Sequence, residues 1–262
     1  MKARILLDGG NPKVPPEELR EVILEAGIGV STGRADFGVV VGGDGRFGWY
    51  GRTEDIPLLF VGVRSKGPAG SRAHLAATTF DELPEALRRI KRGDYRIVEH
   101  RRLRVLKNKK SIGEVFTDVY LQRGSESTCI RYNVRVSGMG SKIDEAAIGD
   151  GVVISTRAGS SGYYSYPDRI RGDWMDPLAF AELGADEVGL CHITPTYTER
   201  KGTGKHPLRY VVPWGCRIEL SLYREADARL YGTTNSSEGV KVRMGDVVTV
   251  EAGKGCTKLV SL

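Results

Sequence analysis

An acidic residue stands inside a glycine-rich turn that follows an apolar run. Residues 37–43 read FGVVVGG, and Asp44, Gly45 and Arg46 come directly after them. Glycines let backbone N–H groups approach phosphate oxygens, because no Cβ atom blocks the way. A carboxylate at this place can accept the proton of an attacking hydroxyl as a γ-phosphoryl group departs, or help to hold Mg²⁺. The turn therefore favours phosphoryl transfer, with Asp44 as the candidate base.

Two other interpretations of the same residues have to be weighed. Gly43–Gly48 matches the dinucleotide fingerprint GxGxxG, which normally follows the first strand of its fold, whereas this turn follows the second. No acidic residue closes the next strand, and a carboxylate inside the loop repels a pyrophosphate. The second alternative makes Asp44 an ordinary turn residue, since Asp-Gly is a common turn pair.

A second polar cluster lies in the middle of the chain. Residues 149–156 read GDGVVIST, and residues 157–165 continue with RAGSSGYYS. Small residues and hydroxyls allow close contact with a polar ligand, tyrosines offer a flat face to a base or ribose, and Arg157 is a candidate phosphate ligand. The alternatives are a Ser/Gly loop between two strands and, for Asp150, a simple turn.

A third candidate is Glu114, which we expect at the start of a strand with apolar neighbours. A carboxylate there can accept hydrogen bonds from ribose hydroxyls or a purine amino group. The alternative is a charge on an edge strand that discourages aggregation.

The first hundred residues alternate strand and helix signals, which predicts a parallel, doubly wound α/β sheet. One helix is predicted to open at Pro15 and end at Gly27, with apolar residues at i, i+3, i+4 and i+7, and a second runs from Asp81 to Gly93. The predicted strands of this part are 4–7, 37–41 and 56–63.

After about residue 98 short strands separated by turn residues dominate the pattern. They are predicted at 115–121, 130–136, 152–156, 209–212, 217–223, 228–231 and 247–250, with one short helix at 176–184. The basic stretch 88–110 is interpreted as a solvated helix face and linker, or as a rim that steers a phosphorylated ligand. We therefore predict an α/β domain over 1–98 and a mostly-β domain over 99–262, with the last strands as candidates to return to the first domain.

Composition narrows the class of protein. Apolar residues make up 40% and charged residues 27% of the 262, which excludes wholesale disorder. The net charge of +6 suits an anionic ligand but does not by itself indicate nucleic acid. The longest apolar runs are strand-sized, so we expect no membrane contact. The N-terminus reaches Asp8 too early for a signal peptide, which favours the cytoplasm.

Cysteine, histidine and amide usage adds two expectations. The four cysteines and four histidines show no CxxC or HExxH spacing, so we expect reduced, mostly buried thiols and no protein metal site. Gln122 is the only glutamine, which hints at a heat-adapted source.

In this order and spacing, these motifs resemble the NAD kinase family over most of the chain. Residues 36–45 resemble the family's strand and GGDGT motif, and 56–63 resemble the strand that follows. Residues 114–115 fall where its NE/D motif is expected, and 149–163 resemble its GDG and STPTGSTAY segment.

The resemblance implies an N-terminal α/β domain and a C-terminal β domain with the active site between them. It implies transfer of the γ-phosphoryl of ATP, or of polyphosphate, to the 2′-hydroxyl of the adenosine ribose of NAD. Mg²⁺ or Mn²⁺ and a homo-dimer or homo-tetramer are implied as well. Asp44 would be the base, and the other implied or candidate nucleotide-contacting residues are Gly43, Gly45, Arg46, Gly113, Glu114, Asp150, Arg157, Ser161, Gly162, Tyr163 and Tyr164.

Several residues depart from the family pattern. Arg46 replaces its Thr, Gly113 its Asn, Ile148 a common basic residue, Arg157 its Pro and Tyr164 its Ser. A site that loses a hydrogen-bonding partner can lose discrimination on the order of a thousandfold. The acceptor therefore stays open. The alternatives are a kinase of the same architecture acting on a polyol, nucleoside or lipid headgroup, and a non-catalytic NAD- or nucleotide-binding protein.

Overall fold

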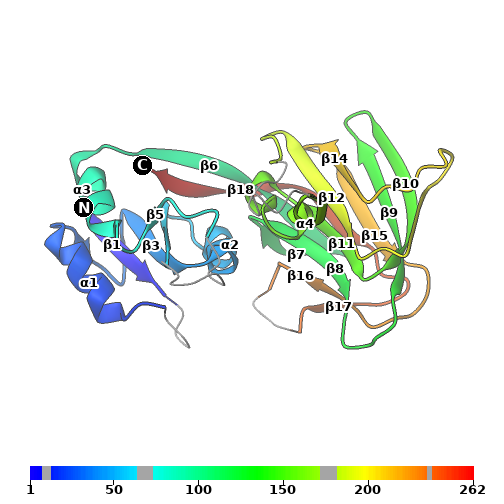
Figure 1. Ribbon diagram of the computed structural model, residues 1–262, viewed down its shortest axis with the longest axis horizontal. Coiled ribbons are helices and arrows are strands. Elements are labelled where there is room, and N and C mark those ends of the chain that lie inside the picture. The colour runs from blue at the N-terminus through cyan, green and yellow to red at the C-terminus, as the bar shows by residue number, and fades with distance from the viewer. Residues whose placement is uncertain (8–12, 64–72, 172–181, 235–237) are drawn as a thin grey trace. The chain divides into compact units, whose positions relative to one another are not determined.

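The computed structural model describes residues 1–7, 13–63, 73–171, 182–234 and 238–262 (Figure 1). The chain forms two compact units, which consist of Met1–His100 with Cys256–Leu262, and of Arg101–Gly255. Strands β6 (Arg96–Lys107) and β18 (Val248–Ser261) each run through both units. Most of the helix predicted at 176–184 lies outside the described residues.

The first unit is built on a parallel sheet with strand order β2-β1-β3-β4-β5. Its strands are β1 (Lys2–Leu6), β2 (Gly29–Val30), β3 (Phe37–Gly42), β4 (Leu58–Gly62) and β5 (Thr78–Thr79). All residues of β3 and β4 are buried, as expected for strands covered on both faces. The end of β18 joins β4 in parallel, with Leu259 opposite Leu58.

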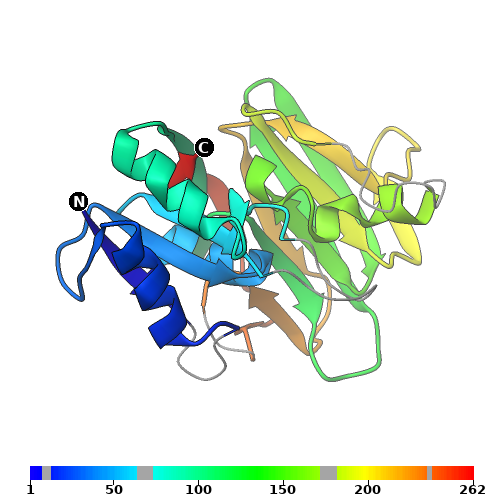
Figure 2. The ribbon, with the colours of Figure 1, turned by 60° about the vertical axis from the view of Figure 1, so that its left-hand side comes forward.

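Three helices accompany this sheet, namely α1 (Pro16–Glu25), α2 (Asp44–Thr53) and α3 (Leu83–Arg92). Helices α1 and α3 pack together on one side of the strands (Figure 2) and bury Leu19, Ile23, Leu87 and Ile90. Both end where predicted, because the glycine after each helix takes a positive φ. Among the described residues no helix is long and apolar enough to cross a membrane.

The second unit packs two antiparallel sheets around one apolar core. One has the order β13-β10-β9-β15-β18, with β6 and β7 continuing it, and the other β14-β12-β11-β8-β16-β17. The bounds are β7 (Lys110–Val115), β8 (Asp118–Arg123), β9 (Ile130–Gly138), β10 (Ser141–Gly149), β11 (Gly151–Ser155), β12 (Glu187–Ile193), β13 (Tyr197–Arg200), β14 (Arg209–Pro213), β15 (Arg217–Leu222), β16 (Ala228–Tyr231) and β17 (Val240–Val242). Between β11 and β12 lie η1 (Arg157–Gly159), η2 (Tyr163–Ser165) and α4 (Tyr166–Arg171).

The predicted fold class, α/β followed by mostly β, is confirmed, but three local predictions are wrong. The residues after β3 form helix α2 rather than a turn alone. The strand predicted over 115–121 is two strands, because the chain breaks pairing at Phe116 and Thr117. The linker expected within the basic stretch 88–110 is mostly strand β6, whose many arginines mask its alternation of half-buried and exposed residues.

All four cysteines are free in the structure. Cys191 and Cys216 are buried, while Cys129 and Cys256 are half-buried. They are therefore somewhat more accessible than the sequence suggested.

An ion pair at the turn before β18 provides a test of the second unit. Asp246 pairs with Lys107 at 2.9 Å and accepts hydrogen bonds from the Asn108 side chain and the Arg243 N–H. Burial raises the pKa of Asp246, but these donors prevail and lower it to about 2. Because the folded pKa is depressed, this stabilisation is present above pH 4 and is lost as the pH falls toward 2.

We therefore expect Asp246→Asn to lower the free energy of unfolding at pH 7 by about 1 kcal/mol after solvent screening. Urea titrations at pH 7 and pH 3 measure this, and the difference from wild type should shrink at pH 3. Asp94→Asn, at an exposed ion pair with Arg89, is the control and should change little. An equal loss of unfolding free energy at pH 7 and pH 3 would contradict the lowered pKa of Asp246.

Candidate active site

Asp44 is the first residue of helix α2, and Gly43 is its N-cap in an extended conformation. The first N–H groups of a helix have no partner inside the helix, and together with the helix dipole they favour an anion. A Cβ atom at Gly43 or Gly45 would meet nothing within 4 Å, and Gly45 is exposed. Ligand phosphates can thus reach bare backbone at this turn.

Two backbone amides hold the carboxylate of Asp44. Its Oδ2 accepts a hydrogen bond from the His74 N–H at 3.0 Å, and its Oδ1 accepts one from the Leu75 N–H at 2.9 Å. The side chain is half-buried. Each carboxylate oxygen can accept a further hydrogen bond, so the group is oriented and still able to take a proton from a hydroxyl.

Packing under α2 keeps the turn in place. The Phe47 ring stacks on Phe60 of β4 with ring centroids 4.3 Å apart, and the Thr257 hydroxyl of β18 donates to the Gly51 carbonyl. The Tyr50 hydroxyl donates to the Leu7 carbonyl at 2.9 Å. Burial raises the pKa of Tyr50, while the positive charge of Arg46 lowers it in part.

The segment after β11 is the second candidate region, and its hydroxyls hold its own backbone. The Ser160 hydroxyl donates to the Arg157 carbonyl at 2.7 Å, and that of Ser165 to Gly162 at 2.7 Å. A Cβ atom at Gly159 would lie 2.4 Å from the Thr117 carbonyl oxygen, so only glycine fits there. The hydrogen bonds therefore fix the conformation of the loop, and Gly159 packs against Thr117, next to the start of β8.

The predicted contacts of this segment differ in accessibility. Tyr163 is half exposed, and Ser161 is partly exposed. Arg157 is exposed and pairs with Glu182 at 3.3 Å. Tyr164 is buried under the Arg209 guanidinium, 5.0 Å from its ring centroid, so it serves packing in this structure.

Asp118, at the start of β8, is a candidate that the sequence analysis missed. A Cβ atom at Gly162 would lie 3.3 Å from its Oδ2. Tyr120 on the same strand contacts Tyr163 edge-on, with ring centroids 5.3 Å apart. Burial raises the pKa of Asp118 to about 6, although a hydrogen bond from Thr117 lowers it in part. A perturbed acid beside a candidate ligand loop is typical of functional sites.

Glu114 contacts a different part of the unit. It is the fifth residue of β7, and its Oε1 accepts hydrogen bonds from the N–H groups of Lys254 and Gly255 at 3.1 and 3.4 Å. Gly113 has a φ of 144°, and a Cβ atom there would lie 3.3 Å from the Thr233 carbonyl oxygen. The structure thus brings Asp118, rather than Glu114, beside Gly162 and Tyr163.

Asp150 occupies the tight turn between β10 and β11. Its Oδ1 lies 2.6 Å from the Arg123 Nε, and its own N–H donates to the Ile193 carbonyl at 2.9 Å. Gly151 has a φ of 148°, and a Cβ atom there would lie 1.9 Å from the Leu121 carbonyl oxygen. This position therefore requires glycine, and the Asp150 carboxylate is fixed on a rigid backbone.

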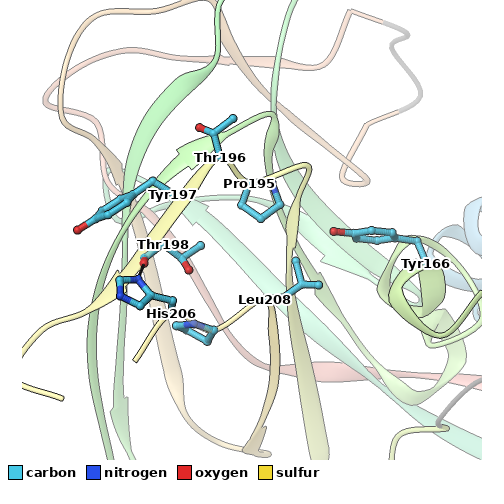
Figure 3. Close-up of a pocket in the computed structure, with 8 residues that line it drawn as sticks. Tyr166, Pro195, Thr196, Tyr197, Thr198, His206 and Leu208 are labelled. Carbon is cyan, nitrogen blue, oxygen red and sulfur yellow. Dashed lines mark hydrogen bonds between the residues drawn. The ribbon is translucent and has the colours of Figure 1, made fainter. Parts of the chain in front are cut away.

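A separate cavity of about 520 Å³ lies beside β12 and β13 (Figure 3). Tyr166 of α4 lines it from one side, and Tyr197 and His206 line it from the other. The His206 Nδ1 donates to the Thr198 carbonyl, which fixes the ring. The predicted site residues do not line this cavity.

With this geometry in view, comparisons with known proteins agree on one family. The chain is 28% identical over 236 residues to the NAD kinase of Citrifermentans bemidjiense, an alignment that covers 86% of this chain and 72% of that protein. It is 29% identical over 234 residues to the NAD kinase of Geobacter sulfurreducens, covering 86% and 73%. No family model matches the sequence.

Solved structures show the same fold. The yeast NADH kinase complexed with NADH has a TM-score of 0.70 at 15% identity, with 100% of this chain and 83% of that chain covered. An NAD kinase from Archaeoglobus fulgidus in complex with ATP has a TM-score of 0.66 at 18% identity, covering 100% and 93%.

The architecture is therefore that of the NAD kinases. In sequence as well as in fold, the chain resembles this family over most of its length.

The raised pKa of Asp118 gives a stability test. An acid whose folded pKa exceeds its unfolded value destabilises the fold when ionised, so wild-type stability should rise as the pH falls from about 6 to 4. We expect Asp118→Asn to raise the free energy of unfolding at pH 8 by about 1–3 kcal/mol, with a smaller gain at pH 4. Denaturant titrations at both pH values measure this. Asp186→Asn, at an exposed side chain, is the control. A destabilised Asp118→Asn at pH 8 would show that the ionised form is needed for folding.

Proposed function

We propose that the chain is an NAD kinase that transfers the γ-phosphoryl group of ATP to the 2′-hydroxyl of the adenosine ribose of NAD. One observation carries this proposal: the Asp44 carboxylate is oriented by two amides at a glycine turn whose backbone is open to phosphates. The similarity to NAD kinases in sequence and in fold supports it.

In the proposed reaction Asp44 accepts the proton of the ribose hydroxyl as that oxygen attacks the γ-phosphorus. The bond between the γ-phosphorus and the β–γ bridging oxygen breaks, and ADP leaves. The N–H groups at the start of α2 bind phosphate oxygens, with Gly43 and Gly45 leaving room for them. A pure binding protein gains nothing from an acid beside phosphates, which favours catalysis over a silent homologue.

A divalent cation fits this turn as part of the nucleotide. Mg²⁺ is commonly held by one or two carboxylates together with substrate phosphates, and Asp44 offers one carboxylate here. Among the described residues no group of three His, Cys, Asp or Glu could hold a metal ion. Mg²⁺ or Mn²⁺ bound to ATP would neutralise the charge that develops on its phosphates.

The second unit supplies the proposed contacts to NAD. Asp150 and Asp118 are the acids that would accept hydrogen bonds from ribose hydroxyls or amino groups, and Tyr163 offers a partly exposed ring. We propose Asp118 in place of Glu114 for this role, because Asp118 lies beside Gly162. The polyphosphate alternative, the homo-oligomer and the cytoplasmic location stay predictions from the sequence.

The first test is an endpoint assay with ATP, Mg²⁺ and NAD, in which an enzyme specific for NADP detects the product. Wild type should form NADP, and Asp44→Asn should lower turnover by about 10²–10⁴-fold while nucleotide binding persists, because the base is lost and the turn is kept. Asp55→Asn, at an exposed neighbouring acid, is the matched control and should keep full activity.

Three other results would change the proposal. An equal loss of binding and turnover in Asp44→Asn would make Asp44 structural. ADP release only with other hydroxyl compounds would identify another acceptor, such as a polyol, nucleoside or lipid headgroup. Tight NAD binding without turnover would indicate a non-catalytic homologue.

The open space at Gly45 gives an independent test. Alanine has a higher helix propensity than glycine, and its Cβ atom would meet no protein atom, so Gly45→Ala should keep or raise the melting temperature. We expect its KM for ATP or NAD to rise at least tenfold, because the methyl group occupies the path of the phosphate. Gly33→Ala, at another glycine with open space, is the control for stability and activity. Unchanged kinetics in Gly45→Ala would remove this turn from the ligand site.

A further inference from the structure

A buried chain of polar side chains lies behind the Asp150 turn in the second unit. The Tyr132 hydroxyl on β9 donates to the Gly151 carbonyl and lies 2.8 Å from Nδ1 of His192 on β12. Nε2 of His192 contacts Oε1 of Glu145 on β10. Tyr132, His192 and Glu145 are each completely shielded from solvent. Such a network is costly unless all its members are satisfied, so it calls for an explanation.

The number of available protons fixes the direction of each hydrogen bond. A carbonyl oxygen only accepts, so the single hydroxyl proton of Tyr132 points to Gly151. The proton between Tyr132 and His192 must then sit on Nδ1 of His192. With Nδ1 protonated, a neutral ring would turn the Nε2 lone pair toward Glu145. One further proton must therefore lie between His192 and Glu145.

The surroundings of Glu145 place that proton on His192. Arg200 on β13 donates to Oε2 of Glu145 at 3.1 Å, and Tyr210 on β14 donates to Oε1 at 3.4 Å. The Arg200 guanidinium also lies 4.4 Å from the centroid of the Tyr210 ring. A cation and a hydroxyl donor both favour the carboxylate form of Glu145, so His192 keeps both ring protons.

The other titratable groups around the histidine do not compete for this proton. Burial raises the pKa of Tyr132 well above its usual value, and burial likewise raises that of Cys191 to about 12. Tyr166 of α4 donates to the backbone carbonyl of His192 at 3.2 Å. These groups remain neutral in the ordinary pH range and leave the His192–Glu145 pair as the charged centre.

We propose that His192 is a positioning residue for the nucleotide site. As an imidazolium held by Glu145, it directs the Tyr132 hydroxyl proton onto the Gly151 carbonyl. That hydrogen bond fixes the turn on which Asp150 is carried. The consequence for NAD rests on the proposed function, whereas the protonation state of His192 is a property of the free protein.

The first experiment is ¹⁵N NMR of protein labelled in histidine, at pH 7.5 and without ligand. We expect both ring nitrogens of one buried histidine to carry protons. His74→Gln, His100→Gln and His206→Gln assign the His192 signals by elimination. A His192 ring with one unprotonated nitrogen would overturn the proposal.

The second experiment separates positioning from general stability with a matched pair of variants. Tyr132→Phe removes the donor to Gly151, while Tyr210→Phe removes a hydroxyl from the same network that does not touch the turn. We expect Tyr132→Phe to shift the Gly151 carbonyl ¹³C resonance and to raise the Kd for NAD about tenfold. Tyr210→Phe should leave the Gly151 resonance in place and change the Kd for NAD by no more than about twofold.

Equal effects of the two variants on the Gly151 resonance and on NAD affinity would overturn the positioning role. If the wild-type protein makes no NADP and binds no NAD, the proposed function fails. The histidine NMR and the Gly151 resonance then still decide whether His192 orders this turn.

Discussion

In the proposed function, each candidate region has to hold an acid near a phosphorylated ligand without cancelling the charge or the acceptor atoms that this acid needs. Three aspartates meet this constraint in three ways. Asp44 is held by two neutral amides, which do not offset its negative charge, so the carboxylate is able to accept a proton. Asp150 is held by the Arg123 guanidinium, which offsets its charge and leaves an oriented acceptor. Asp118 is half-buried, and this burial raises its pKa to about 6. The three acids thus have different partners, which agrees with the role of base proposed for Asp44 and the binding roles proposed for Asp150 and Asp118.

The glycines of the candidate regions divide into two kinds according to what an added Cβ atom would contact. At Gly151 and Gly159 a Cβ atom would collide with backbone carbonyl oxygens, so the fold itself requires glycine. At Gly43 and Gly45 a Cβ atom would meet nothing, although Gly45 lies in a helix where glycine costs up to about 1 kcal/mol relative to alanine. A glycine that the fold does not need, at a position where it weakens a helix, is best explained by a ligand that approaches the backbone.

Local sequence patterns were sufficient to predict part of the fold. The apolar run of β3 and the helices ending at Gly27 and Gly93 could be predicted, because each is set by neighbouring residues. Helix α2 could not, since its glycines disfavour a helix and the stacking of Phe47 on Phe60 compensates from another strand. Asp118 was hidden in an apparently continuous strand. The pairing of His192 with Glu145 joins residues 47 apart, and no local pattern encodes it.

The buried network also bears on why the second unit keeps charge in its interior. Replacing a buried ion pair by well-packed apolar residues is often neutral or stabilising, so stability alone does not account for His192 and Glu145. An apolar side chain in place of Tyr132 would leave the Gly151 carbonyl without that donor, in a turn whose φ of 148° few residues adopt. We therefore infer that the network orients the turn rather than stabilising the fold. Tyr132 donates to the Gly151 carbonyl next to Asp150, and the charges of His192 and Glu145 are buried.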